Sequence, residues 1–326
     1  MKIITLLVCL MISLSVQAEK LTIYTYDSFV SEWGPGPIIK ESFEKNFNIE
    51  LEFIPVDSAA TLLNKIILEG SSTKADIVLG LDMNLFDAAK KSNLFAKHNI
   101  ESIDQIIQLP IPWDSDTFVP YNYGYFAFVY NNKKLKKPPL SMDELINSTE
   151  ARIVIQDPRT STPGLGLLTW MKAIYGDKAG NEWKKLNKKI ISVTKGWTDA
   201  YYNFFMTGEA DIVLSYTTSP AAHIMFEENY DISASIFDEG NYISIEFAGI
   251  LNKSNNKKIA NKFIKFILSD DFQSVIPSTN IMYPVTNLNN LPEAFKNLEI
   301  PKVIQINPEE INYNKEYWID EWLNAS

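Results

Sequence analysis

The chain has 326 residues, of which 46% are hydrophobic and 21% are charged, and its formal net charge is −10. A nucleic-acid partner requires a basic face, whereas here the lysines are scattered among aspartates and glutamates, so the charge argues against such a partner. An acidic chain is compatible with a cationic ligand, although acidity alone does not specify one.

Residues 1–18 have the pattern of a secretory signal peptide. Lys2 precedes a short apolar run, and "VQA" puts small residues at the −3 and −1 positions of a cut after Ala18. The run is too short for a membrane-spanning helix. The only cysteine, Cys9, follows "LLV", a poor lipoprotein cleavage site, so the mature chain keeps no thiol for disulfides, zinc or nucleophilic chemistry. We expect an exported protein located in the periplasm.

Residues 19–326 exceed the size at which one hydrophobic core usually stops growing, which favours two domains. Strand-like and helix-like segments alternate from the start of this region. The segments are "KLTIYTY", "GPIIKESFEKNF", "IELEFIPV" and "AATLLNKIILEG", followed by the apolar "ADIVLGLD". This order predicts an α/β protein with mostly parallel sheets flanked by helices.

The stretch "ADIVL" occurs at 75–79 and again at 210–214, each time after an amphipathic segment that ends at a glycine, Gly70 or Gly208. Its unbroken apolar pattern is typical of a strand covered on both faces. Two sheets, one in each lobe, explain the repeat, and a single large sheet is the alternative. Because ligands collect beyond the carboxyl ends of such strands, Asp82 and residues 215–218 are predicted to line one cleft.

Two extended runs are predicted to connect the lobes. The aromatic-rich "FVPYNYGYFAFVYN" crosses from the first lobe to the second, and "YISIEFAGIL" is the return crossing. Helical patterns follow in "KKIANKFIKFILS" and "NPEEINYNKEYWIDEWLN". The expected parts are an N-terminal lobe of residues 19–120 and 243–290, a C-terminal lobe of residues 121–242, and a helical segment, residues 291–326, whose lobe the sequence leaves open.

Two predicted helix openings carry hydroxyl residues before a proline, Thr162–Pro163 in "RTSTPGLGLLTWM" and Ser219–Pro220 in "SYTTSPAAHIMF". Free amide hydrogens and hydroxyls at such an end can bind an anionic group, and an ordinary cap is the alternative. Aromatic side chains in predicted loops can stack on a flat heterocycle or face a cation. These aromatic residues are Tyr26, Trp33, Trp197 and Tyr216.

Signs of catalysis are few. His98 and His223 are the only histidines, neither has the spacing of a paired metal ligand, and no "GxSxG" occurs. Arg159, next to "TSTPG", could form an anion clamp or a structural ion pair. We therefore expect no metal site, no cofactor and no enzymatic activity.

Over almost all of the mature chain, the order and spacing of these motifs resemble the periplasmic thiamine-binding proteins of bacterial ABC importers. The matching segments are "YTYDSF" with "WGPGP", "ADIVLGLD", "DTFVP" with "YGYFAFVY", "QDPRTSTPGLGLLTWM", "TKGW", "ADIVLSYTTSPA" and "MYPV". The resemblance implies a type II periplasmic-binding-protein fold, in which two α/β lobes joined by hinge strands close over thiamine or its phosphates. It also implies a monomer that delivers the ligand to an inner-membrane permease.

The resemblance also implies roles for individual residues. Aromatic side chains stack on the ligand and stabilise its cation, a carboxylate such as Asp82 bonds the aminopyrimidine, and Ser161 with its neighbours captures the hydroxyl or phosphate tail. The predicted ligand-binding residues are Tyr26, Trp33, Asp57, Ser58, Asp82, Ser161, Thr162, Trp197, Tyr216 and Ile281.

This chain departs from the family pattern at three places. A tyrosine often follows "SPA", where this chain has Ala222, and a tryptophan often precedes "MYPV", where it has Ile281. An acidic pair and a glycine often follow "IPV", where it has "DSA" at 57–59. The departures leave phosphorylated thiamine, a pyrimidine precursor or another small ligand as alternative cargoes. Iron, a polyamine or a sugar acid are further alternatives, because related two-lobed proteins carry them. A thiamine-cleaving enzyme of this fold would need a cysteine nucleophile, which the mature chain lacks.

Overall fold

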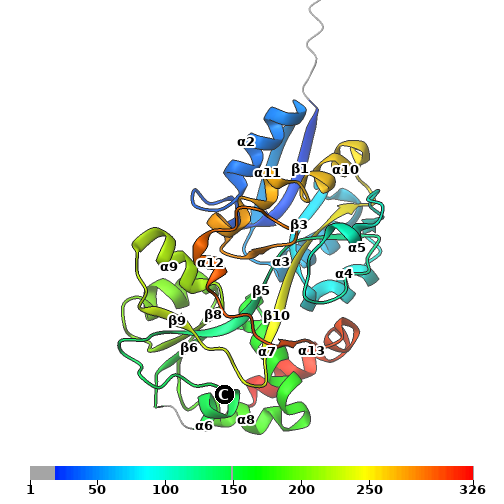
Figure 1. Cartoon of the computed structure of the whole chain (residues 1–326). Helices are drawn as coiled ribbons and strands as arrows, with labels where there is room; N and C mark the ends of the chain where they lie inside the picture. The colour runs from blue at the N-terminus through cyan, green and yellow to red at the C-terminus, as the bar shows by residue number, and fades with distance from the viewer. Residues whose placement is uncertain (1–18, 148–149, 326) are drawn as a thin grey trace, which may run out of the picture.

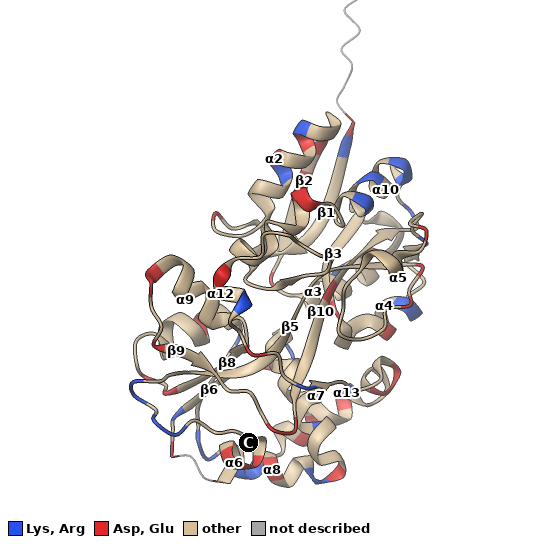
Figure 2. Cartoon of the chain, in the orientation of Figure 1, with Lys and Arg blue, Asp and Glu red and all other residues tan. Residues whose placement is uncertain are grey.

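The computed structural model describes residues 19–147 and 150–325. The predicted signal peptide, with its cleavage site and Cys9, lies outside these residues. Within them, no helix is both long enough and apolar enough to cross a membrane. Figure 2 shows acidic and basic residues interspersed on outer helices such as α2 (Gly36–Phe47) and α8 (Ala179–Leu186), in line with the scattered charges of the sequence.

The main sheet runs in the order β2-β1-β3-β10-β5-β8-β6-β7. The strands are β1 (Lys20–Tyr26), β2 (Glu50–Val56), β3 (Ile77–Asp82), β4 (Phe95–Ala96), β5 (Phe118–Asn131), β6 (Ile153–Gln156), β7 (Ile190–Thr194), β8 (Ile212–Tyr216), β9 (Ile232–Ala234), β10 (Asn241–Leu251), β11 (Tyr283–Pro284) and β12 (Val303–Ile304). In one lobe β1 pairs in parallel with β2 and β3, and in the other β6 pairs in parallel with β7 and β8.

Helices cover both parts of the sheet (Figure 1). Besides α2 and α8, the α-helices are α1 (Asp27–Val30), α3 (Ala59–Glu69), α4 (Phe86–Lys91), α5 (Ile103–Ile106), α6 (Met142–Asn147), α7 (Thr162–Tyr175), α9 (Ser219–Glu227), α10 (Lys257–Phe266), α11 (Asp270–Gln273), α12 (Glu293–Lys296) and α13 (Pro308–Leu323). The 3₁₀ turns are η1 (Gly70–Ser72), η2 (Met83–Leu85) and η3 (Gly176–Lys178), and the π-helices are η4 (Asp199–Phe205) and η5 (Ile276–Asn280).

Two long antiparallel strands, β5 and β10, run from one lobe into the other (Figure 1). The first part of β5 pairs with β10 and β11, and its last part pairs with β8 and β9. These strands are the hinge, because β5 has partners in both parts of the described sheet and β10 pairs alongside it. The predicted two-lobed α/β fold is therefore present.

Two β-bulges flank β10 at the middle of the hinge. Gly80 of β3 has no paired residue on β10, and Tyr121 of β5 has none either. Gly80 has a φ of 106°, which side chains other than glycine rarely adopt. Bulges re-aim neighbouring side chains. Here they lie beside Glu246, which is paired with Asp82 on one side and Asn122 on the other.

Both copies of "ADIVL" form buried strands, as their apolar pattern predicts. The first follows α3, which ends at Gly70 as expected. The segment before the second copy differs from the prediction, because residues 199–205 form the π-helix η4 instead of an ordinary amphipathic α-helix. Its buried side chains, including Tyr201 and Phe205, pack into a small second core under β8.

The C-terminal helix α13 packs against α4 and η2 in one lobe and against α7 and α8 in the other. Asn312 donates to Asp87 over 2.8 Å, and Glu321 forms an ion pair with the buried Lys172 over 2.5 Å. The sequence left the lobe of this segment open, and the helix contacts both.

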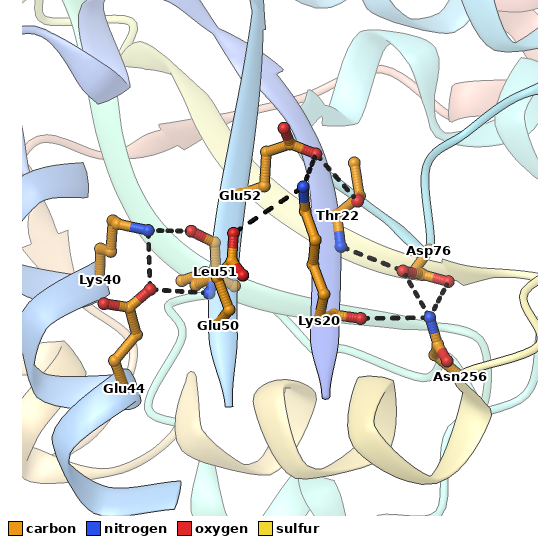
Figure 3. A network of polar contacts seen from close by, with 9 residues as sticks. All are labelled: Lys20, Thr22, Lys40, Glu44, Glu50, Leu51, Glu52, Asp76 and Asn256. Atoms are coloured by element: carbon orange, nitrogen blue, oxygen red, sulfur yellow. Dashed lines mark hydrogen bonds and ion pairs between the residues drawn. The ribbon is translucent and has the colours of Figure 1, made fainter. Parts of the chain in front are cut away.

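A polar network lies at the amino-terminal end of the N-terminal lobe, away from the carboxyl ends of the strands (Figure 3). At one side of it the buried Asp76 accepts hydrogen bonds from the Thr22 amide, 3.0 Å away, and from the Ser254 hydroxyl, 2.6 Å away. Asn256 bonds the same carboxylate. These contacts tie the start of β3 to β1 and to the segment before α10, and so they stabilise the lobe.

Candidate functional site

A cavity of about 870 Å³ lies between the lobes, at the carboxyl ends of β1 and β8. Its size falls in the range of small-molecule sites, roughly 300 to 1,000 Å³. The predicted ligand-binding residues that line it are Tyr26, Trp33, Asp57, Ser58, Ser161, Thr162, Trp197, Tyr216 and Ile281. The remaining predicted residue, Asp82, is not among the lining residues.

Tyr26 occupies the N-terminal lobe side of the cavity. Its ring lies over Gly80, where a Cβ atom would come within 2.4 Å of the ring. Its hydroxyl lies 3.0 Å from Glu246 Oε2 and 3.3 Å from Asn280 Oδ1. Burial, with the adjacent Glu246 carboxylate, raises the pKa of Tyr26 well above its ordinary value. Tyr26 is therefore a neutral hydrogen-bond donor with a fixed ring.

Trp197 forms part of the opposite wall, where Tyr201 and Ser215 hold its ring in position. Its ring stacks on Tyr201 with centroids 4.7 Å apart, and its indole nitrogen donates to Ser215 Oγ over 2.7 Å. The Tyr201 hydroxyl lies 2.9 Å from Nε2 of His223, whose Nδ1 lies 2.9 Å from Glu227 Oε2. A rigid aromatic face loses little conformational freedom on binding.

Hydroxyl groups of the α7 opening also face the cavity. The structure puts the N-cap at Ser161, one residue before the predicted Thr162, and Pro163 lies in the first turn. Ser161 is buried and its side chain makes no capping hydrogen bond, so its hydroxyl is free to meet a ligand. The same one-residue difference occurs at α9, where Thr218 instead of Ser219 is the N-cap.

Asp82 lies beneath the cavity. Its side chain accepts hydrogen bonds from Thr162 Oγ1 at 2.9 Å and from the Asn84 amide at 2.8 Å, and the residue is 1% exposed. Burial raises the pKa of Asp82. Direct contact between Asp82 and a ligand stays a prediction, and the present geometry gives it the role of holding Thr162 across the lobes.

Several carboxylates line the cavity, among them Glu246 of the hinge strand β10. The motif analysis missed it. One signal was available, because Glu246 is the only charged residue of the otherwise apolar run "YISIEFAGIL". Buried charges are rarely retained without a partner or a function.

The two arginines do not serve the cavity. Arg159 forms a bidentate pair with Asp157, with Nη2 and Oδ2 2.6 Å apart, and Arg152 pairs with Asp211. Arg159 is not a lining residue, so the structural ion pair is the correct reading. In the part of the chain that the structure describes, no group of histidine and carboxylate side chains could hold a metal ion.

An ion pair crosses the mouth of the cavity. Lys195 Nζ lies 2.7 Å from Asp57 Oδ2, and the two residues belong to opposite lobes. Both side chains are exposed, at 73% and 66%, so the pair is weak and screened by salt.

We expect Lys195→Met to speed release of a bound ligand about two- to fivefold at low salt, because one contact between the lobes is lost. The release rate of this variant should respond less to added salt, as measured by stopped-flow tryptophan fluorescence. Lys97→Met is the matched control, since Lys97 forms an equally exposed ion pair with Asp116 inside one lobe. An equal effect of both substitutions would contradict a role for the mouth ion pair.

Comparisons with known proteins agree with this geometry. Residues 72–306 match the family described as bacterial extracellular solute-binding protein. The thiamine-binding periplasmic protein of Escherichia coli (strain K12) is 48% identical over 307 residues, which cover 94% of this chain and 93% of that protein.

Solved structures show the same fold. A periplasmic thiamin binding protein superposes with a TM-score of 0.91 at 48% identity, covering 95% of this chain and 97% of that one. Iron-bound HitA from Pseudomonas aeruginosa superposes with a TM-score of 0.77 at 18% identity, covering 94% and 99%. The second likeness is evidence for the fold alone. The fold expected from the sequence is confirmed.

Proposed function

This chain belongs to the family of bacterial extracellular solute-binding proteins, and we propose that it captures thiamine in the interlobe cavity as the periplasmic subunit of an ABC importer. The observation that carries the proposal is the 48% identity to a thiamine-binding periplasmic protein along nearly the whole chain. The protein is a binding component of transport and not an enzyme.

The cavity suits each part of thiamine. Aromatic faces from both lobes can enclose the flat aminopyrimidine and the thiazolium cation. These faces belong to Tyr26, Trp33, Trp197 and Tyr216. The free hydroxyl of Ser161 and the amide hydrogens at the start of α7 suit the hydroxyethyl tail or a phosphate on it. Closure of the lobes over the ligand gives the permease a conformation that it can distinguish from the open one.

The finer parts of the proposal concern the mature chain. We propose cleavage after Ala18, a monomer, and binding of thiamine phosphates as well as thiamine. The proposed lobes are residues 19–120 with 243–290, and residues 121–242. The segment 291–326 is assigned to both lobes, because α13 packs on each.

Isothermal titration calorimetry with thiamine, its monophosphate and its diphosphate tests the function. We expect saturable heat with one site per chain and a rise in melting temperature, since a ligand that binds only the folded state stabilises it. Absence of heat and of any melting shift with all three compounds would reject thiamine as the ligand. Native mass spectrometry of freshly purified protein would then weigh whatever ligand is retained.

We expect Ala222→Tyr to tighten thiamine binding about 2- to 10-fold. Ala222 is half-buried on α9 and lines the cavity, so a tyrosine there adds an aromatic face to the wall. Ala222→Leu is the control, because it adds apolar volume without a ring. Equal affinities of the two variants, measured by calorimetry, would show that stacking at this position contributes nothing.

A further inference from the structure

The hinge strand β10 carries a carboxylate into the cavity, and no basic side chain of the described residues forms an ion pair with it. We propose that Glu246 is the residue that selects a cationic ligand, by holding a fixed negative charge at the cavity floor. The inference rests on the proposed function, because thiamine supplies the cation. Beyond that function, the inference names Glu246 as the residue that distinguishes a cationic ligand from a neutral one.

The hydrogen bonds around Glu246 converge on one of its two oxygens. Oε2 lies 2.6 Å from the Tyr121 hydroxyl, 2.7 Å from Asn122 Nδ2 and 3.0 Å from the Tyr26 hydroxyl. No described residue donates a hydrogen bond to Oε1, so Oε1 is the oxygen that a ligand can reach. Three donors on one oxygen favour the ionised carboxylate. These donors stabilise the charged form of the carboxylate and leave its second oxygen available.

The donors come from separate parts of the fold. Tyr26 ends β1, and Tyr121 and Asn122 belong to the hinge strand β5. The side-chain oxygen of Asn280 of η5 lies 3.3 Å from the Tyr26 hydroxyl, a longer alternative acceptor for its single proton. The bulges at Gly80 and Tyr121 lie immediately beside Glu246. The carboxylate is therefore fixed in position by several elements, as a group that recognises charge must be.

The charges that face Glu246 have the same sign or are neutral. Asp82 is its direct cross-strand partner on β3, at a spacing where two like charges repel. Burial raises the pKa of Glu246, and the Asp82 charge raises it further. The pKa values of Tyr26, Tyr121 and Tyr216 are raised well above the ordinary range by burial, so these three groups stay neutral. A ligand cation is the charge that this floor lacks.

A bound cation stabilises the ionised form of Glu246, so binding and deprotonation are linked. As the pH falls through the raised pKa, the Glu246 carboxylate of the free protein takes up a proton. That proton must leave before the carboxylate can pair with a bound cation. Affinity for a cation is therefore expected to fall toward acidic pH. In the free protein, a carboxyl group with a raised pKa adds to the free energy of unfolding only at low pH, and this contribution is lost as the pH rises through the pKa. At pH 7.5 Glu246 therefore adds no such stability, and Glu246→Gln is expected not to lower the melting temperature.

The test compares two ligands that differ in charge. One is thiamine, and the other is its thiophene analogue, in which carbon replaces the charged ring nitrogen. We expect Glu246→Gln to weaken thiamine binding about 10- to 100-fold and to change the affinity of the neutral analogue less than about threefold. Asp76→Asn is the matched control, since Asp76 is a buried, hydrogen-bonded carboxylate outside the cavity.

The possible outcomes separate the two proposals. If the unmodified protein does not bind thiamine, the proposed function fails and this inference fails with it. If thiamine binds, and folded Glu246→Gln retains its affinity or loses affinity equally for both ligands, only the selection by Glu246 is overturned. A charge-dependent loss that is shared by Asp76→Asn would also overturn it.

Discussion

Gly80→Ala is expected to destabilise the protein by about 2–6 kcal/mol and to abolish thiamine binding at micromolar concentrations. Alanine at a φ of 106° is strained, at a cost of about 1–3 kcal/mol. Its Cβ would also lie 2.4 Å from the Tyr26 ring, and overpacking of this kind costs about 1–3 kcal/mol. Relief requires Tyr26 to leave its place against β3, which removes one wall of the cavity. Urea unfolding and calorimetry measure the two effects.

Gly70→Ala separates backbone strain from the clash. Gly70 also has a positive φ, 50°, but no atom lies within 4 Å of the position its Cβ would occupy, and it does not line the cavity. We expect a loss of about 1 kcal/mol with unchanged thiamine affinity. If Gly80→Ala behaves like Gly70→Ala, the close approach of Tyr26 to β3 has no energetic consequence.

Trp197→Ala is expected to weaken thiamine binding about 10- to 100-fold. Stacking and cation–π contact of one indole contribute roughly 1 to 3 kcal/mol at a desolvated site. The substitution also removes the partner of Tyr201 and the donor to Ser215, so the wall loses its support as well as its face. Calorimetry and tryptophan fluorescence titration should agree on the loss.

Trp197→Phe is the companion variant. It keeps an aromatic face but cannot donate to Ser215, so we expect a smaller loss of about three- to tenfold. Unchanged affinity in Trp197→Ala, with the free protein still folded, would place the ligand elsewhere in the cavity. A loss in Trp197→Phe as large as in Trp197→Ala would mean that the hydrogen bond to Ser215 matters more than stacking.

Local pattern was sufficient to predict most of the elements. β1, α2 and β5 begin and end where their apolar periodicity and flanking turn residues place them. The segment 199–205 was beyond such reasoning, because its aromatic spacing fits an α-helix. The structure has a π-helix there, which packs against β6 and β8. The predicted helix caps, Thr162 and Ser219, each lie one residue after the observed caps, Ser161 and Thr218. Several neighbouring hydroxyl residues can fill the same position, so the sequence does not decide between them.

Strand ends and loop aromatics could be found from the sequence, which is why Tyr26, Trp197 and Tyr216 were predicted and do line the cavity. The sequence could not tell toward which face of the sheet the Glu246 side chain points, because this orientation depends on bulges that form only when β3, β10 and β5 pair. Asp82 and Glu246 are cross-strand partners, and only tertiary structure tells which of the two carboxylates meets the cavity and which lies beneath it.

The bulges also bear on how the sequence of this protein can change. Side chains alternate along a strand, so a single inserted or deleted residue normally moves every later side chain to the opposite face of the sheet. Gly80 in β3 and Tyr121 in β5 are each one extra, unpaired residue opposite β10. The segments of β3 and β5 on either side of these positions therefore keep separate phases of alternation.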